Sequence, residues 1–243
     1  MRRRSSLPAA LVMALVSGCL AVLGLVRPAG ALEVSMTGQP ETYVMSFVEA
    51  EVLGFDGVSL GMAMDEVEAL AADKYPGAPR AWGEDPVQGI TLLGVALERL
   101  APFPDGPIFG PASITYVFGA TSKRLIGINL NWYVDGDATP EQRHAILELG
   151  KAYVTQLLRY AWDPFELFRG LLLGPNTVLL FSGSDTAGRR VEVIADGVPL
   201  DVITLPEGTV EHRPVEGGPA RLRVALTARP EEHDVFALPE GSF

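Results

Sequence analysis

The chain has 243 residues, with 30 Asp and Glu against 19 Lys and Arg, a formal net charge of −11 and a single cysteine. This length can bury a hydrophobic core without disulfides. A chain this acidic repels phosphate backbones and anionic lipid, so we do not expect it to bind nucleic acid. Beyond Cys19 it has no thiol nucleophile, disulfide or cysteine-based metal site.

The first 31 residues have the features of a secretory signal peptide. Arginines at 2–4 precede an almost wholly apolar run at 7–26, and Ala29-Gly30-Ala31 supplies the small residues that signal peptidase accepts. We therefore predict export to the periplasm or the extracellular space, with cleavage after Ala31. Residues 1–31 hold four of the basic residues and none of the acidic ones, so the mature chain carries a formal charge of about −15.

Two alternatives for this segment remain open. Val16-Ser17-Gly18-Cys19 resembles a bacterial lipobox, in which the cysteine is acylated and becomes the new N-terminus, although the chain stays apolar from Leu20 to Val26. The apolar run is also about long enough to be retained as a membrane anchor. Contact with a membrane is expected only if Cys19 is lipidated or the signal is retained.

The mature chain begins with residues 32–41, which lack apolar periodicity and are predicted to be a flexible leader. Thr42–Val52 fits either a strand or a helix by spacing, and its aromatic and β-branched residues favour a strand. A helix is predicted over Met64–Lys74, because apolar residues recur on one face and acidic residues lie in its first turn. Tyr75-Pro76-Gly77 ends it.

The stretch Gly57–Leu70 contains Leu60-Gly61-Met62 and, three residues later, Glu66-Val67. This pattern resembles the first helix of small bacterial envelope modules of the BamE (SmpA-like) and β-lactamase-inhibitor-like type. The resemblance implies helices packed on an antiparallel sheet and a role in the cell envelope. The family usually has Ser or Thr where this chain has Ala63, so the capping box with Glu66 lacks its hydroxyl.

Further along the chain, alternating apolar residues predict a sheet. The proline- and glycine-rich residues 76–89 and 101–111 are predicted to be loops. The predicted strands before the second helix are Ile90–Leu97, Ala112–Gly119 and Leu125–Val134. Thr139, followed by Pro140 and Gln142, is a helix start, and this helix is expected to run to about Tyr160 with Ile146, Leu149, Tyr153, Leu157 and Tyr160 buried.

The C-terminal third is predicted to be mainly β. Asp163–Gly170 is read as one or two further helical turns, and Leu205–Gly218 as a loop. The predicted strands are Thr177–Phe181, Arg189–Ala195, Val198–Ile203, Arg221–Thr227 and Val235–Leu238. The predicted fold class is therefore α+β, an antiparallel sheet with helices on one face. It spans 42–243 as a single domain, or as two similar helix and hairpin halves, 42–135 and 136–243.

Candidate metal ligands are few. Glu141 and His144 have the i, i+3 spacing of di-iron bundle ligands, but there is one copy, and a solvated helix face explains it. His212 lies beside Glu211, and His233 lies within the acidic run Glu231–Asp234. Charge clusters of this kind are typical of solvated surface, so no metal site is predicted.

Candidate catalytic groups are also poorly supported. Ser184 and Asp185 lie in a Ser-Gly-Ser-Asp stretch that lacks the glycines of a serine elbow, and a β-turn accounts for it. Gly170–Gly174 lacks the lysine of a phosphate-binding loop. Asp135 and Asp137 flank a strand end and a helix start, where turn formation and capping explain them. Trp82, Trp132 and Trp162 could line a sugar or peptide groove, and core packing explains them more simply.

We therefore predict no catalytic, cofactor-binding or metal-binding residue. The expected function is that of an exported, non-enzymatic envelope protein that binds an envelope protein partner as an interaction or assembly module. Two alternatives come from other classes. One is a periplasmic hydrolase or metal-dependent enzyme that uses Glu141, His144 or Asp185, and the other is a carrier with an aromatic pocket for a small ligand.

Overall fold

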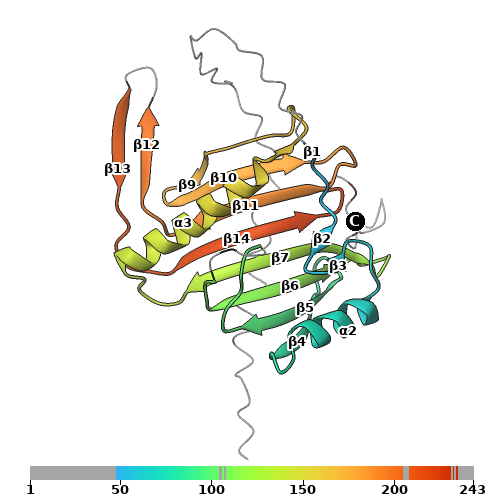
Figure 1. The fold of residues 1–243 in the computed structure, drawn as a ribbon. Coiled ribbons are helices and arrows are strands. Elements are labelled where there is room, and N and C mark those ends of the chain that lie inside the picture. Colours follow the sequence, from blue (N-terminus) through green and yellow to red (C-terminus); the bar gives the residue numbers. More distant parts are fainter. Residues whose placement is uncertain are drawn as a thin grey trace, which may run out of the picture. The chain divides into compact units, whose positions relative to one another are not determined.

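Eight strands form one antiparallel sheet in the order β4-β5-β6-β7-β14-β11-β10-β9 (Figure 1). The computed structural model describes residues 48–103, 106, 108–204, 208–230, 232 and 234. The chain divides into two units, Met1–Phe47 and Val48–Phe243, and all described residues belong to the second. The predicted signal peptide, Cys19 and the leader therefore lie outside the described residues, as do His233 and the predicted strand Val235–Leu238.

Each half of the sheet contains four strands that follow a helix. The helices are α2 (Met64–Lys74) and α3 (Pro140–Leu157). The strands of the sheet are β4 (Arg80–Asp85), β5 (Ile90–Leu97), β6 (Ala112–Phe118), β7 (Leu125–Val134), β9 (Leu171–Gly174), β10 (Thr177–Ser184), β11 (Arg190–Asp196) and β14 (Ala220–Thr227). The two halves meet where β7 pairs with β14 from Val134 and Ala220 to Gly127 and Thr227.

Three short strand pairs lie outside this sheet. They are β1 (Val48–Glu49) with β8 (Tyr160–Ala161), β2 (Gly54–Phe55) with β3 (Val58–Ser59), and β12 (Leu200–Thr204) with β13 (Thr209–Arg213). The β2–β3 turn uses Asp56 and Gly57, both with positive φ, as a two-residue hairpin turn requires. The β12–β13 hairpin stands away from the large sheet (Figure 1).

The core lies between the sheet and the two helices. Alternate residues of the central strands are buried toward the helices because successive side chains of a strand point to opposite faces. These residues are Ile114, Tyr116, Phe118, Ile128, Leu130, Trp132, Leu222 and Val224, and they pack with Val67 and Ala71 of α2 and Ile146 and Leu149 of α3. Burial of each large side chain contributes roughly 1.5–3 kcal/mol before entropy is counted.

Local chemistry sets the start of each helix. The Thr139 hydroxyl accepts a hydrogen bond from Gln142 N, and the Gln142 side chain accepts one from Thr139 N, which completes the capping box predicted for α3. At α2 only half of the box exists, because Glu66 accepts from Ala63 N at 2.9 Å while Ala63 has no side-chain acceptor. Both predicted helices are confirmed, although α3 ends at Leu157.

One buried charge fixes α3 to the base of the β12–β13 hairpin. Arg143 is 2% exposed, and its guanidinium donates to the carbonyl oxygens of Gly197, Gly217 and Gly218 at 2.6–2.8 Å and to Pro219 O at 3.3 Å. A buried guanidinium needs such acceptors to offset its loss of water. Arg143 lies three residues before Ile146 on the buried stripe.

The predicted α+β class is wrong. The described residues are mostly β, with 44% strand and 16% helix, and their one large sheet is accompanied by two helices. Residues predicted as loop form β4 and β13, and Asp163–Gly170, predicted as further helix, contain a turn at 163–166 but no helix. Two similar halves, each a helix and a two-stranded hairpin, were the predicted arrangement. This is also wrong, since each half of the sheet contains four strands.

Candidate interaction edge

The strand β9 forms one end of the large sheet. On its inner side it pairs with β10, with Leu171 opposite Leu179 and Leu172 opposite Val178. On its outer side no strand among the described residues pairs with it. An edge strand of this kind presents free N–H and C=O groups that can pair with another chain.

Exposed large apolar side chains are concentrated in the stretch of chain that leads into this edge strand. Seven of the fourteen exposed large hydrophobic residues of the described chain lie between 158 and 173, which is too dense a group to be scattered surface residues. They are Leu158, Tyr160, Phe165, Phe168, Leu171, Leu172 and Leu173, and we name them the apolar edge. Phe165 is 89% exposed, the most of any large hydrophobic residue described.

Backbone pairing holds the segment before β9 along the same side of the sheet. Asp163 N donates to Ser184 O, and Phe168 and Ser182 exchange two backbone hydrogen bonds at 2.8 and 2.9 Å. A side-chain turn, in which Asp163 Oδ1 accepts from Phe165 N, turns the Phe165 side chain outward. The chain from Asp163 to Gly174 therefore covers β10 along its whole length and carries five of the seven residues of the apolar edge.

Charge at the apolar edge differs from charge over the rest of the protein. The segment 158–173 contains two arginines and two acids, whereas the whole chain carries −11. Glu166 is paired with Arg190 at 2.6 Å, and Arg159 and Arg169 are exposed without an ion pair among the described residues. An acidic partner can therefore approach here with less repulsion than over the rest of the acidic surface.

The opposite end of the sheet is protected differently. The outer strand there, β4, carries the exposed charged residues Arg80 and Glu84, with Trp82 between them and Gly83 next to Glu84. Charged residues on an edge strand oppose pairing with another chain. The contrast makes β9, and not β4, the candidate interaction site.

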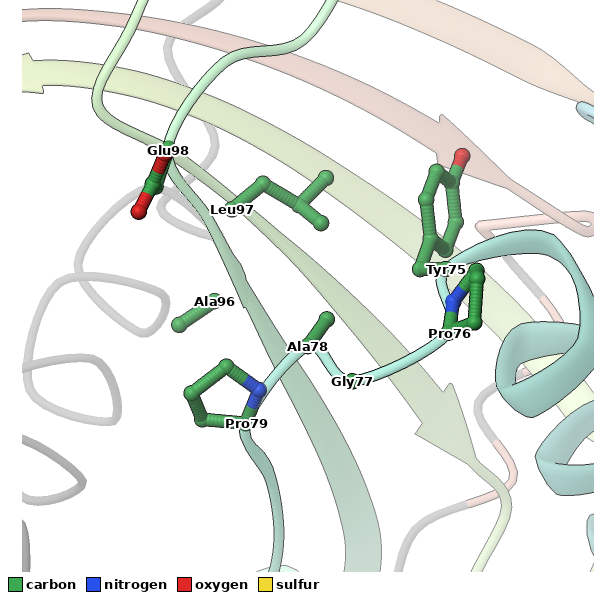
Figure 2. A pocket seen from close by; sticks show the side chains of 8 residues that line it. All are labelled: Tyr75, Pro76, Gly77, Ala78, Pro79, Ala96, Leu97 and Glu98. Atoms are coloured by element: carbon green, nitrogen blue, oxygen red, sulfur yellow. The ribbon is translucent and has the colours of Figure 1, made fainter.

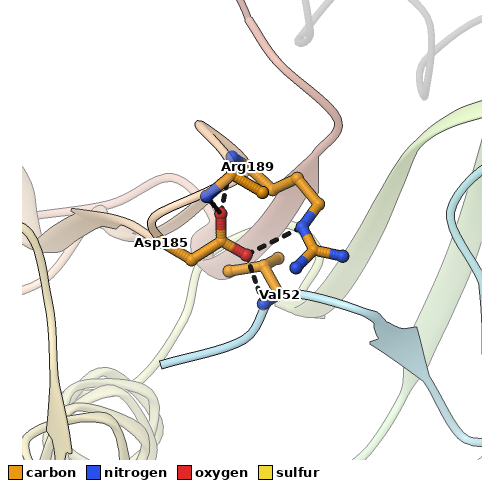
Figure 3. A network of polar contacts seen from close by, with 4 residues as sticks. Val52, Asp185 and Arg189 are labelled. Carbon is orange, nitrogen blue, oxygen red and sulfur yellow. Dashed lines mark hydrogen bonds and ion pairs between the residues drawn. The ribbon is translucent and has the colours of Figure 1, made fainter. Parts of the chain in front are cut away.

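Asp185 is used structurally. It is 4% exposed, and its carboxylate accepts from Val52 N, Ala187 N, Arg189 N and Arg189 Nε at 2.7–2.9 Å (Figure 3). Burial raises the pKa of this carboxyl, but the hydrogen bonds from Val52 and Arg189 and the Arg189 charge outweigh it, so its pKa lies below the ordinary value. Ser184 is buried, and its hydroxyl accepts from Arg190 Nε at 3.2 Å rather than facing a base.

The histidine candidates are not brought together. His144 is exposed on α3, 4.0 Å from Glu148, and the Glu141 carboxylate has a lowered pKa through its bonds to its own backbone N–H and to Thr139. His212 pairs with Asp201 at 2.7 Å on the β12–β13 hairpin, where Glu211 pairs with Arg213. No group of three metal-ligating side chains forms among the described residues.

Asp135 and Asp137 lie between β7 and α3. Asp137 accepts a hydrogen bond from Gly218 N at 2.7 Å, and Asp135 is exposed at the end of β7.

Among the described residues, neither helix combines the length and apolar character that a membrane span needs.

The tryptophans lie over three different parts of the sheet. Trp82 on β4 packs against Phe118, Trp132 on β7 is fully buried beside Tyr153, and Trp162 packs against Phe181 of β10. They share no pocket.

A depression of about 310 Å³ lies away from the tryptophans. It is lined by Tyr75, Pro76, Gly77, Ala78, Pro79, Ala96, Leu97 and Glu98 (Figure 2). Glu98 is its one ionised lining residue, so it offers no acid and base pair.

Sequence reasoning missed the apolar edge. Phe165 and Phe168 were read as a helical turn, and Gly170–Gly174 was tested only as a phosphate loop. A usable signal was present, because three leucines at 171–173 stand between Gly170 and Gly174-Pro175, without the charged residues that protect an edge strand.

In comparisons with known proteins, the chain matches no protein-family model, no curated protein and no solved structure. The resemblance of Gly57–Leu70 to BamE-like and inhibitor-like modules therefore stays a prediction.

Proposed function

We propose that this protein is an exported, non-enzymatic module of the cell envelope that binds an extended segment of a partner protein along β9. The observation that carries the proposal is the apolar edge, three residues of which lie on a strand whose outer side is unpaired among the described residues. A bound segment adds a ninth strand to the sheet, with main-chain hydrogen bonds giving affinity and side-chain contacts giving specificity.

The leucines of β9 can contact both faces of such a segment. Leu171 and Leu172 lie on opposite faces, because they pair with the successive residues Leu179 and Val178 of β10. Phe165 and Phe168 extend the apolar contact beyond the end of β9. A partner segment with apolar residues on both faces therefore fits this edge.

The periplasmic hydrolase alternative finds no support at Glu141, His144 or Asp185. The first two are exposed on α3, and the carboxylate of Asp185 is occupied by hydrogen bonds within the fold. The aromatic-pocket alternative needs tryptophans that converge, and they lie on separate parts of the sheet.

Site-specific photocrosslinking in the native host tests the binding proposal. A photoreactive phenylalanine analogue at Leu172 should crosslink to one defined protein, and the same analogue at Ala81 on β4 should not. With the purified partner, the amides of β9 should gain protection from hydrogen exchange, and Leu172→Lys should weaken binding at least about tenfold. Equal crosslinking from both edges, or β9 amides that stay unprotected in the complex, would refute the proposal.

Export is tested separately by the intact mass of the protein isolated from cells. A mass that begins at Leu32 supports a soluble exported form. A mass that begins at an acylated Cys19 supports a lipoprotein, and a full-length mass supports a retained anchor.

A further inference from the structure

A shallow, open groove of about 540 Å³ lies between α3, Leu180 of β10 and the residues just before β9. Its lining residues are Lys151, Val154, Thr155, Leu158, Arg169, Gly170 and Leu180. Four of them lie at successive positions i, i+3, i+4 and i+7 along one side of α3. The groove therefore follows the helix for roughly 10 Å, which accommodates an alkyl chain on the order of eight carbons.

The floor of the groove suits an aliphatic chain better than a peptide. Val154, Leu158 and Leu180 contribute only methyl and methylene groups, and the Thr155 hydroxyl already donates to Lys151 O at 2.9 Å. The main chain of a helix is hydrogen-bonded within the helix, so α3 offers no backbone partners along the groove. A bound peptide backbone would stay unsatisfied there, whereas an alkyl chain needs no partner.

The charge at the groove selects an anion. Arg169 is exposed and has no ion pair among the described residues, while Lys151 is held by Glu148 at 2.8 Å. Arg169 is therefore the cation available to a ligand, and a guanidinium can hold a carboxylate through two parallel hydrogen bonds. In a chain of net charge −11, this is a local reversal of sign beside an apolar surface.

We propose that this groove binds one medium-chain fatty acid, with its carboxylate on Arg169 and its alkyl chain against Val154, Leu158 and Leu180. The proposal does not depend on pairing at β9, because the groove uses side chains of α3, Leu158, Arg169 and Leu180, while a partner strand would pair with the outer backbone of β9. It assigns the protein a second, small-molecule ligand.

Calorimetric titration of the full mature protein with octanoate, decanoate and dodecanoate, each below its micellar concentration, tests the proposal. We expect saturable binding of one molecule, with affinity rising roughly fourfold for each methylene added from octanoate toward decanoate and little further for dodecanoate, whose tail is longer than the groove. Arg169→Gln should weaken decanoate binding about tenfold and Arg169→Glu further, while the matched charge reversal Arg80→Glu on β4 should change nothing. Decyltrimethylammonium, with the same tail and a positive head, should bind at least about tenfold more weakly than decanoate.

Three results would each overturn the proposal. The first is that none of the three acids shows saturable binding. The others are that Arg169→Gln binds decanoate as tightly as the native protein does, or that decyltrimethylammonium binds as tightly as decanoate. Arg169 is exposed, so both substitutions should leave the fold intact, and circular dichroism spectra that match the native protein verify this.

Discussion

Replacing Asp185 by Asn removes the charge of a buried carboxylate while keeping its shape. The amide keeps one oxygen for the turn donors Ala187 N and Arg189 N, but its NH₂ group meets the donors Val52 N and Arg189 Nε, which now lack an acceptor. Hydrogen bonds to a charged group contribute about 1.5–3 kcal/mol each, and Arg189 Nε can recover part of its loss from water. We expect a loss of about 3 kcal/mol in the free energy of unfolding at pH 7.

The effect of this substitution should depend on pH in one direction. The pKa of Asp185 is lower in the folded protein than in the unfolded chain, where an aspartate titrates near about 3.9. Its contribution is therefore complete above that pH and is lost as the pH falls through the folded-state pKa. The difference between the native protein and Asp185→Asn should be constant from about pH 5 to 8 and should shrink below about pH 4.

Urea unfolding followed by tryptophan fluorescence measures both the loss in the free energy of unfolding and its dependence on pH. Asp163→Asn is the matched control, because Asp163 also accepts a backbone N–H in a turn, and an exposed turn of this kind should cost less than about 1 kcal/mol. The Val52 amide should also exchange with solvent faster in Asp185→Asn. A loss below about 0.5 kcal/mol at pH 7, or a difference that persists unchanged to pH 2, would show that the carboxylate does not hold the chain at Val52.

Three further substitutions test the fold by the same unfolding assay. Arg143→Met should lose about 2–3 kcal/mol, because it leaves several loop carbonyls without their donor; an effect below 1 kcal/mol counts against this role. Gly197→Ala should lose at least about 2 kcal/mol, since φ is +65° and a Cβ atom would contact Pro219 O, and native-like stability would contradict it. Thr139→Ala should lose about 1 kcal/mol through the helix cap, and Thr139→Ser should restore most of it.

Local signals in the sequence predicted a helix or strand correctly where several of them agreed. The alternation in β6 and β7 and the capping box at Thr139 predicted their elements closely, because burial, propensity and termination signals all favour the same structure there. The strand β4 was missed because Arg80–Asp85 has little β-propensity of its own. It is extended because it pairs with β5 along its whole length.

The fold class and the candidate site depended on contacts that are distant in the sequence. Phe165 and Phe168 have helical spacing, yet this segment is extended because Phe168 pairs with Ser182 on β10. The exposure of Leu171–Leu173 follows from the position of β9 at the end of the sheet, which no local pattern encodes. Arg143 could have been recognised from the sequence, as a charged residue on the buried stripe of α3.

The last strand of the large sheet lies at its centre. Because β14 is inserted between β7 and β11, the first four strands can pair among themselves long before the strand that joins them to the rest has been synthesised. Until β14 has been synthesised, β7 and β11 each have one unpaired side. Pairing between strands that are separated by so many residues in the sequence is slow. A nascent chain that ends before Ala220 therefore contains two separate, incomplete sheets. It should depend on chaperones or be degraded, whereas the full-length chain should not.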